Sequence, residues 1–183
     1  MRTIEEERRE VLALKRKLKV VKNDVIVCHT KEHDANNRYD SLVGIPGRPK
    51  SPSVKPYGWV TKDTRVFIYY KQSPACPKSG IYVVVKATGE PYYDDTVVPE
   101  WADAFPEEVY PHRIPTRPFY RFKRPVTLAD LRQMGIRRLI DGRVVNTLPH
   151  LIRTLVPISR NDGNRILNEL LRRNPGVPRR PDC

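Results

Sequence analysis

The stretch Thr64–Ala87, TRVFIYYKQSPACPKSGIYVVVKA, is the part of the sequence that says most about the fold. Its two ends, TRVFIYY and IYVVVKA, are rich in β-branched and aromatic residues, which suit the pleated surface of a strand. The segment between them contains proline, serine and glycine, which are typical of turns. The stretch therefore predicts a β-hairpin with strands over Thr64–Tyr70 and Ile81–Ala87.

Weaker patterns on both sides of this hairpin complete the prediction. The further predicted strands cover 24–28 and 110–122, and the predicted helices cover 3–19, 127–134 and 159–173. Residues 41–60 and 89–108 are expected to form long loops. Short strands with flanking helices predict an α+β fold with a small curved sheet or barrel. The sequence lacks the βαβ rhythm and the glycine-rich phosphate-binding motifs of nucleotide-binding folds.

The length of 183 residues suits one domain of ordinary size. We expect an N-terminal helix over 1–22, a folded domain over 23–173 and a Pro/Arg-rich tail or linker over 174–183. No apolar run approaches the ~18–20 residues of a membrane span, and the charged N-terminus does not resemble a signal peptide. These features predict a soluble, cytoplasmic protein without a membrane partner. The linker-like tail hints that a motor or nuclease module follows the domain.

The net charge of +13 is concentrated in the last part of the chain. Residues 1–110 hold 18 Lys and Arg against 16 Asp and Glu, whereas residues 111–183 hold 16 against 5. Of those last 16 cations, 15 are arginine, whose guanidinium group suits phosphate oxygens and stacks on bases. This distribution predicts a nucleic-acid binder. A heat-adapted, arginine-rich proteome is the alternative explanation, which 18 prolines against 9 glycines support.

The residues that could carry catalysis or hold a metal form no recognisable set. The three cysteines make no CxxC pair. His29 and His33 are four residues apart and could form half of a metal site, but no third ligand has suitable spacing. The acidic residues between 90 and 108 could hold a carboxylate pair, although such runs usually form a solvated loop edge. We therefore predict no catalytic residue, no metal and no cofactor, and keep a nucleic-acid-modifying enzyme as an alternative.

Aromatic residues gather in the two predicted loops. Tyr57 and Trp59 lie in the first loop, and Tyr92, Tyr93 and Trp101 lie in the second. Aromatic side chains on loops beside a sheet grip single bases by stacking, at ~1–3 kcal/mol per base. Trp101 stands in the polar sequence PEWAD, where both a core anchor and a base-stacking wall are open interpretations.

Six short motifs, in order along the chain, resemble the successive signatures of EVE domains. They are Val43-Gly44-Ile45-Pro46 before a basic loop, VFIYY, Ser79-Gly80-Ile81-Tyr82, Glu90-Pro91-Tyr92-Tyr93-Asp94, Tyr110-Pro111-His112-Arg113 and Val156-Pro157-Ile158. EVE domains belong to the PUA-like superfamily and are related to YTH domains. The resemblance covers roughly residues 24–173. It implies a small PUA-like (EVE/YTH-like) curved β-barrel with peripheral helices.

The resemblance also implies a non-enzymatic module that reads a modified base, flipped from the stack into an aromatic pocket. In relatives, the pocket walls come from positions that correspond to Val43 and Trp101. Relatives usually have tryptophan where Val43 stands, so Tyr57 or Trp59 is a candidate substitute. Asp94 matches the acid after EPY in the family and could accept a hydrogen bond from a base edge or cap a turn. The predicted pocket consists of Val43, Gly44, Ile45, Pro46, Tyr57, Trp59, Tyr92, Tyr93, Asp94 and Trp101.

Basic residues are predicted to contact the phosphate backbone: Arg48, Lys50, Lys55, Arg113, Arg117, Arg121, Arg124 and Arg143. The favoured partner is duplex DNA with a methylated base, either 5-methylcytosine or N6-methyladenine. The resemblance suggests a modification-dependent restriction system as the context, because such domains precede a motor domain in McrB-type proteins. A PUA-like RNA-binding protein that acts on tRNA or rRNA is the alternative, since similar charge and aromatic residues would serve it.

Overall fold

The computed structural model describes Glu6, Arg9 and residues 23–29, 41–45, 56–96, 110–140, 143–145 and 155–177. The strands in these ranges are β1 Asp24–His29, β2 Leu42–Ile45, β3 Arg65–Tyr70, β4 Gly80–Ala87, β5 Tyr92–Tyr93, β6 His112–Val126, β7 Arg138–Ile140, β8 Arg143–Val145 and β9 Leu155–Ile158. The helices are α3 Leu128–Gln133 and α4 Arg160–Arg173. None of these described helices is long and apolar enough to cross a membrane.

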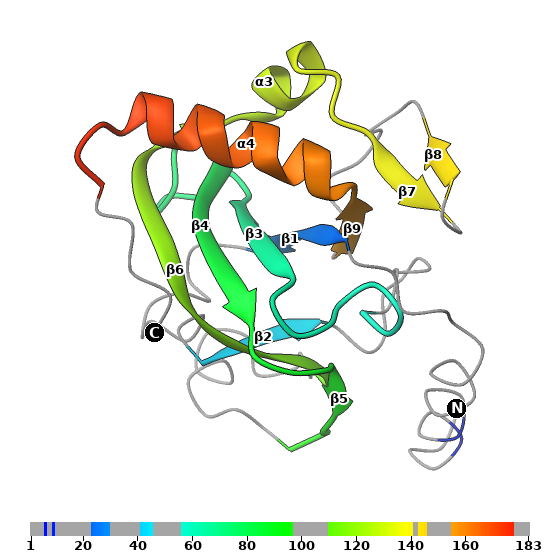
Figure 1. Cartoon of the computed structure of the whole chain (residues 1–183). Helices are drawn as coiled ribbons and strands as arrows, with labels where there is room; N and C mark the ends of the chain where they lie inside the picture. Colours follow the sequence, from blue (N-terminus) through cyan, green and yellow to red (C-terminus); the bar gives the residue numbers. More distant parts are fainter. Residues whose placement is uncertain are drawn as a thin grey trace.

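The strands form one curled sheet in the order β2-β6-β4-β3-β1-β9-β7-β8, with β5 also paired to β6. Strands β1 and β3 run parallel, and β3 and β4 form the predicted antiparallel hairpin, in which Phe67 lies opposite Val84. Strand β6 is long: residues 116–126 pair with β4, and the first four residues pair with β2 and β5 (Figure 1). This arrangement confirms the predicted α+β fold, a small PUA-like curved barrel with peripheral helices.

Two apolar cores explain why β1 and β3 are buried along their whole length. Side chains on the concave face form an inner core, among them Val27, Ile68 and Ile114. Alternate residues on the outer face, such as Phe67, form a second core with Ile166 and other residues of α4. Figure 1 shows α4 lying across this outer face of the sheet. A strand buried on both faces is continuously apolar, as TRVFIYY is in the sequence.

Helix α4 is held at both ends by side-chain hydrogen bonds. Ser159 is the N-cap and accepts from the backbone N–H of Asp162. At the other end, the Asn174 side chain accepts from the N–H groups of Lys123 and Arg124 and donates to the carbonyl of Arg124. These bonds fix the helix to β6, as the sequence predicts for an amphipathic helix that closes the domain.

Several strands form in segments where the sequence predicts a loop, or for which it predicts no helix or strand. Strand β2 lies within the predicted loop 41–60, and β5 lies within the predicted loop 89–108. Strands β7, β8 and β9 are also additional to the prediction. All five have two to four residues, so long-range pairing rather than local propensity makes them strands. The predicted helix 3–19 lies outside the described residues except for Glu6 and Arg9.

A cluster of ion pairs joins α3 to α4. Arg173 Nη1 donates to Asp130 Oδ2 at 2.7 Å, and Arg173 Nε donates to Glu169 Oε1 at 2.7 Å. The hydrogen bond from Arg173 holds the pKa of Asp130 well below its ordinary value. Hydrogen bonds from Arg172 and Arg173 lower the pKa of Glu169 to about 2. Both carboxylates are therefore ionised in the folded protein at neutral pH.

We expect these two carboxylates to make the stability depend on pH. Their contribution is complete above the ordinary pKa of glutamate, 4.5, and is lost as the pH falls toward 2, because both groups must then take up a proton. Arg173→Met should remove most of the Asp130 contribution and only part of that of Glu169, which Arg172 still binds, and should cost about 1 kcal/mol at neutral pH. Thermal unfolding between about pH 6 and 3 checks the result. Arg132→Met, on the exposed side of α3, is the control and should keep the wild-type dependence.

Candidate nucleic-acid interface

The first residues of β6 lie at the centre of a small group of strands. Ile45 of β2 lies opposite His112, and Tyr93 of β5 lies opposite the same residue on the other side. The turn at residues 56–60 contributes Tyr57, whose hydroxyl group reaches the His112 ring. Three segments that the sequence places far apart therefore meet at His112.

Five aromatic side chains lie around the first residues of β6, and we call them the aromatic cluster. The rings of Tyr57 and Tyr93 contact His112, and His29 and Tyr110 form a second ring pair. The Tyr57 and Tyr93 rings each lie 5.6 Å from the His112 ring, at interplanar angles of 85° and 67°. Such edge-to-face contacts are the favoured geometry of aromatic pairs. A hydrogen bond of 3.1 Å joins Tyr57 Oη to His112 Nδ1. The cluster therefore has fixed ring orientations before any ligand binds.

The hydroxyl group of Tyr57 is neutral in this setting. Burial raises the pKa of Tyr57 above its ordinary value, and the neighbouring Tyr93 raises it further. The side chain is 1% exposed. Tyr57 thus acts as a neutral hydrogen-bonding group and as a wall of the cluster.

His29 connects the cluster to β2. Its Nε2 lies 2.9 Å from the carbonyl oxygen of Gly44. A carbonyl can only accept, so Nε2 carries the proton and donates. The His29 ring also lies 6.2 Å from the Tyr110 ring. This contact fixes the backbone of the predicted Gly44 element against the cluster.

Arg113 ties the segment after β5 to β6. Its Nη1 donates to Asp94 Oδ2 at 2.6 Å and to Thr96 Oγ1 at 3.2 Å, and its Nη2 donates to the carbonyl of Thr96. Its Nε donates to the carbonyl of Tyr110 at 3.3 Å. The Arg113 side chain is only 6% exposed. This burial corrects the prediction that Arg113 contacts phosphate, because its guanidinium group is engaged inside the protein.

Asp94 has the second of its two predicted roles, as a turn residue. Its Oδ1 accepts from the backbone N–H of Thr96 at 2.9 Å, while its Oδ2 pairs with Arg113. The side chain keeps 32% exposure. The contact to a base edge stays a prediction.

The predicted pocket residues separate into two groups. Gly44, Tyr57, Tyr93 and Asp94 come together around β6, and Tyr92 is exposed beside them at 38%. Val43, Ile45 and Trp59 instead lie in the inner core. The alternation of β2 explains this correction, because Val43 and Ile45 point to the same concave face and leave no side-chain surface for a base. Neither Trp59, 8% exposed, nor Tyr57, 1% exposed, offers its ring surface as the substitute stacking wall that their sequence positions suggest. Pro46 and Trp101 lie outside the described residues.

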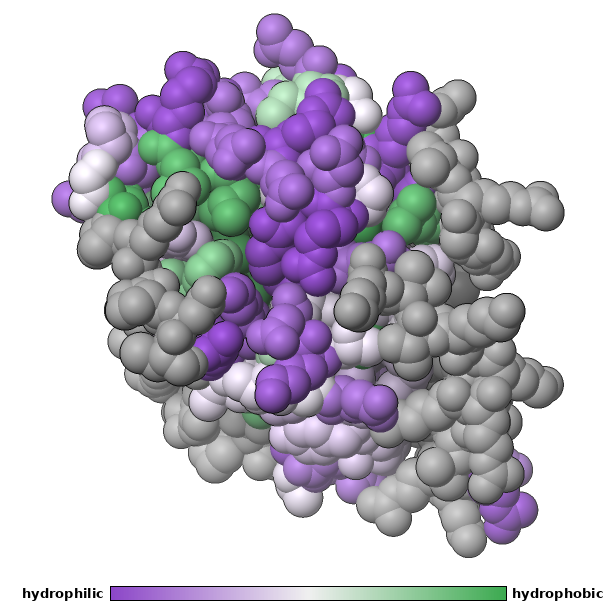
Figure 2. All heavy atoms as spheres, viewed as in Figure 1, coloured by the Kyte–Doolittle hydropathy of each residue, from purple (hydrophilic) through white to green (hydrophobic). Residues whose placement is uncertain are grey.

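The structure describes only some of the basic residues that are predicted to contact phosphate. Arg121 and Arg124 are exposed on β6, and Arg117 is partly exposed, with its guanidinium 3.6 Å from Asp63. Figure 2 shows hydrophilic residues gathered on the face of the molecule that Figure 1 presents, below the helices. Arg48, Lys50 and Lys55 lie outside the described residues, as does the side chain of Arg143. His112 stands in one of the quoted motifs without a predicted role, and the sequence suggests for His29 only half of a metal site.

The described residues offer little for catalysis. Within them, no group of three or more His, Cys, Asp or Glu side chains is placed to hold a metal ion. Cys28 is buried, and burial raises the pKa of its thiol to about 12, so the nucleophilic thiolate is scarce at neutral pH.

Comparison with protein families identifies the EVE domain over residues 59–169, which is more than half of the chain. The chain belongs to the EVE-domain family. Among solved structures, the EVE fold here is similar to a hypothetical protein from Leishmania major, with a TM-score of 0.54, 12% identity and coverage of 84% of this chain and 97% of that chain. It is also similar to human THYN1 protein in complex with 5-methylcytosine-containing DNA, with a TM-score of 0.50, 13% identity and coverage of 80% and 96%. No curated protein sequence matches this EVE chain.

Proposed function

We propose that this EVE domain recognises a modified base in duplex DNA, with the base flipped out of the stack. The observation that carries the proposal is the shared fold with human THYN1, which was solved with 5-methylcytosine-containing DNA. The aromatic cluster adds support, because its buried rings hold the partly exposed ring of Tyr93 beside the exposed Tyr92. The arginine-rich part after residue 110 supplies charge for the phosphates.

The energetics of such recognition are favourable for this site. Flipping a base costs a few kcal/mol of unstacking, which stacking and edge hydrogen bonds in the pocket must offset. One aromatic contact returns ~1–3 kcal/mol. Burying one extra methyl group adds about 0.8 kcal/mol, so a methylated base is preferred when the pocket desolvates that carbon. In this proposal Trp101 forms a pocket wall and Asp94 accepts a hydrogen bond from the base edge.

Fluorescence anisotropy at one fixed salt concentration tests the proposal. The ligands are matched DNA duplexes with no mark, one 5-methylcytosine or one N6-methyladenine, together with an RNA duplex and a single strand. Tighter binding to one marked duplex supports the proposal and identifies the base. Equal binding to all DNA duplexes with a preference for RNA would overturn it in favour of RNA binding, because contacts to the 2′-hydroxyl distinguish the two nucleic acids.

Trp101→Ala is expected to abolish the preference for the marked duplex. The variant should keep the salt-sensitive binding to unmarked DNA, because phosphate contacts supply that term. The ratio of the two dissociation constants, measured by the same anisotropy assay, checks this. A Trp101→Phe variant is the matched control, since it keeps an aromatic face and should retain part of the ratio. A full ratio in Trp101→Ala would remove Trp101 from the pocket.

We further propose that the domain is the recognition part of a modification-dependent restriction system, in which another module or chain cuts the DNA. Under this proposal the purified domain leaves marked and unmarked duplexes intact on prolonged incubation. Any cut or altered product would favour the enzymatic alternative. The test needs only gel electrophoresis and mass analysis of the recovered strands.

A further inference from the structure

A basic groove lies on the outer face of the sheet, beside the first turn of α4. We call it the outer groove; its lining residues are Asp63, Arg65, Lys86, Arg117, Phe119 and Arg160, and its volume is about 540 Å³. Four of these six side chains are cationic and one is anionic. They come from β3, β4, β6, α4 and the turn before β3, so the groove depends on the tertiary fold and not on one basic segment.

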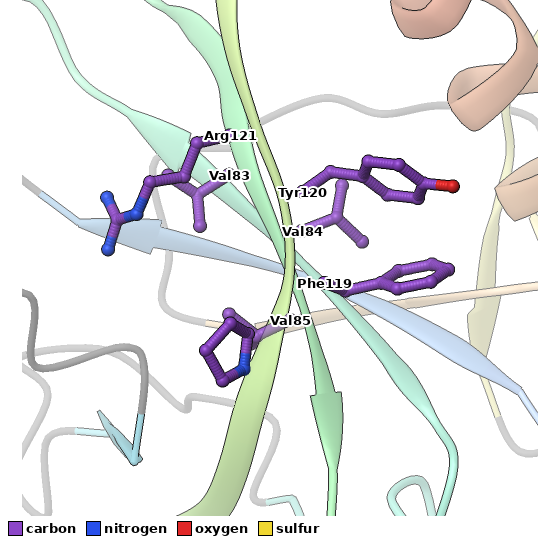
Figure 3. Close-up of a pocket in the computed structure, with 7 residues that line it drawn as sticks. Val83, Val84, Val85, Phe119, Tyr120 and Arg121 are labelled. Carbon is purple, nitrogen blue, oxygen red and sulfur yellow. The ribbon is translucent and has the colours of Figure 1, made fainter. Parts of the chain in front are cut away.

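A β-bulge adds the aromatic residue of the groove. Val84 lies opposite Tyr120, but Val85 lies opposite Pro118, so β6 carries one extra residue at Phe119. Figure 3 shows the consequence: Phe119 and Tyr120 both point to one side of β6, while Arg121 points to the other. Bulges commonly redirect a side chain in this way. Here the bulge brings Phe119 to the outer face, where its ring lies 4.3 Å from Lys86 Nζ and holds the ammonium group by a cation–π contact.

Two of the arginines are fixed by a buried carboxylate beneath the groove. Asp24 is 0% exposed, and its Oδ2 accepts from Arg65 Nε at 3.0 Å, while its Oδ1 lies 2.9 Å from Arg160 Nη1. One carboxylate thus holds two guanidinium groups, which leaves one positive charge in excess. Burial raises the pKa of Asp24, and the hydrogen bonds and charges of Arg65 and Arg160 oppose that rise. Fixed cations of this kind lose little conformational entropy when they bind an anion.

We propose that the outer groove binds phosphates of the nucleic-acid backbone. This inference rests on the proposed function, because it takes nucleic acid as the partner. Guanidinium groups bind phosphate oxygens in a two-pronged geometry, and the groove holds two partly exposed ones, those of Arg117 and Arg160, together with Lys86. Arg65, 9% exposed and bonded to Asp24, adds positive charge beneath them. Asp63, exposed at the rim, holds its carboxylate 3.6 Å from the guanidinium of Arg117, so an incoming phosphate competes with this acid for Arg117.

Strand β6 connects the groove to the aromatic cluster. Arg117 lies five residues after His112 on this strand, so their Cα atoms are at most roughly 17 Å apart at 3.3–3.4 Å per residue. That length corresponds to about five base-pair steps of 3.4 Å. For a duplex that spans both places, this length sets how far the phosphate in the groove lies from the base at the cluster. The phosphates concerned lie within about five steps of the marked base.

The first test is the double variant Lys86→Gln/Arg117→Gln, which spares the arginines bound to Asp24. It should weaken binding to marked and unmarked duplexes alike by about tenfold, reduce the salt slope by about 1.8 and leave the ratio between the duplexes unchanged. Arg132→Gln, an exposed arginine of α3 outside the groove, is the control for loss of charge. Asp63→Asn should tighten binding two- to threefold, a gain that unfolding cannot produce. A double variant that binds like Arg132→Gln, with Asp63→Asn unchanged, would overturn the proposal.

The second test replaces single phosphates of the duplex by neutral methylphosphonates. At one or two positions within about five steps of the mark, this replacement should weaken the wild type but not the Lys86→Gln/Arg117→Gln variant. If no position of the duplex is sensitive and a free nucleotide competes for the outer groove, the groove binds a small phosphate ligand. That result would overturn the assignment to the nucleic-acid backbone. If the wild type binds marked and unmarked duplexes equally and the double variant binds both more weakly, the base-reading proposal is wrong and the groove proposal stands. If the wild type prefers the marked duplex but no methylphosphonate position weakens its binding, the groove proposal is wrong and the base-reading proposal stands.

Discussion

Gly163→Ala is expected to destabilise the domain by about 3–5 kcal/mol, the cost of breaking a buried ion pair. A Cβ atom at this position of α4 would lie 1.9 Å from Oδ2 of Asp24 and 3.0 Å from Nη2 of Arg65. Neither partner can retreat, because Asp24 is fully buried and Arg65 is 9% exposed. The helix must therefore move away from β1, or the Asp24–Arg65 pair must separate.

Urea unfolding at neutral pH measures this loss, with Asn164→Ala as the matched control. Asn164 is the next residue of the same helix and is exposed. Because alanine is the better helix former, this control should be neutral or more stable by a few tenths of a kcal/mol. The same gain in helix propensity applies to Gly163→Ala and is outweighed by the steric conflict. A Gly163→Ala protein within 1 kcal/mol of the wild type would mean that α4 shifts freely over β1.

The elements that the sequence predicts correctly are those with a strong local pattern. The hairpin of β3 and β4 is β-branched and aromatic over its whole length, and α4 has an apolar stripe with Ser159 at its start. Strands β2 and β5 could not be predicted, because four and two residues carry little propensity and their pairing with β6 decides their structure. Gly163 shows that tertiary packing can require a residue that the local pattern disfavours. Within a helix, glycine counts against the prediction, yet here close approach to Asp24 requires it.

The site was predictable in its composition but not in its geometry. Of the predicted pocket, Tyr57 and Tyr93 both contact the His112 ring, whereas Val43 and Trp59 lie in the inner core because of strand pairing and chain curvature. The burial of Arg113 depends on a partner 19 residues earlier that β5 brings into place. Strict alternation along β6 would put Phe119 and Tyr120 on opposite faces of the sheet. The bulge puts both on one face, and the sequence pattern gives no sign of it.

Arg113→Met is expected to cost about 2–4 kcal/mol and to bring the preference for marked DNA close to one. The buried guanidinium joins Asp94, Thr96 and the carbonyl of Tyr110, and methionine fills its space without donating to any of them. Buried acceptors without partners and a carboxylate without its counter-charge account for the loss of stability. The loss of preference follows from the proposed pocket, because residues 94–96 lead directly into the segment that carries Trp101.

The comparison of Arg113→Met with Lys123→Met distinguishes the loss of the contacts that Arg113 makes to residues 94–96 from the loss of one positive charge on β6. Lys123 is an exposed cation of the same strand, so its replacement should leave stability within about 0.5 kcal/mol and the preference for marked DNA unchanged. Arg113→Lys should fall between the two, because one ammonium group cannot bridge the acceptors that the guanidinium fork connects. Unfolding by urea and anisotropy with marked and unmarked duplexes measure both effects on the same protein samples. Arg113→Met protein that is destabilised but keeps its full preference would show that the Asp94–Thr96 segment supports the fold without positioning the pocket. Unchanged stability would instead mean that solvent replaces the guanidinium at no cost, which its 6% exposure argues against.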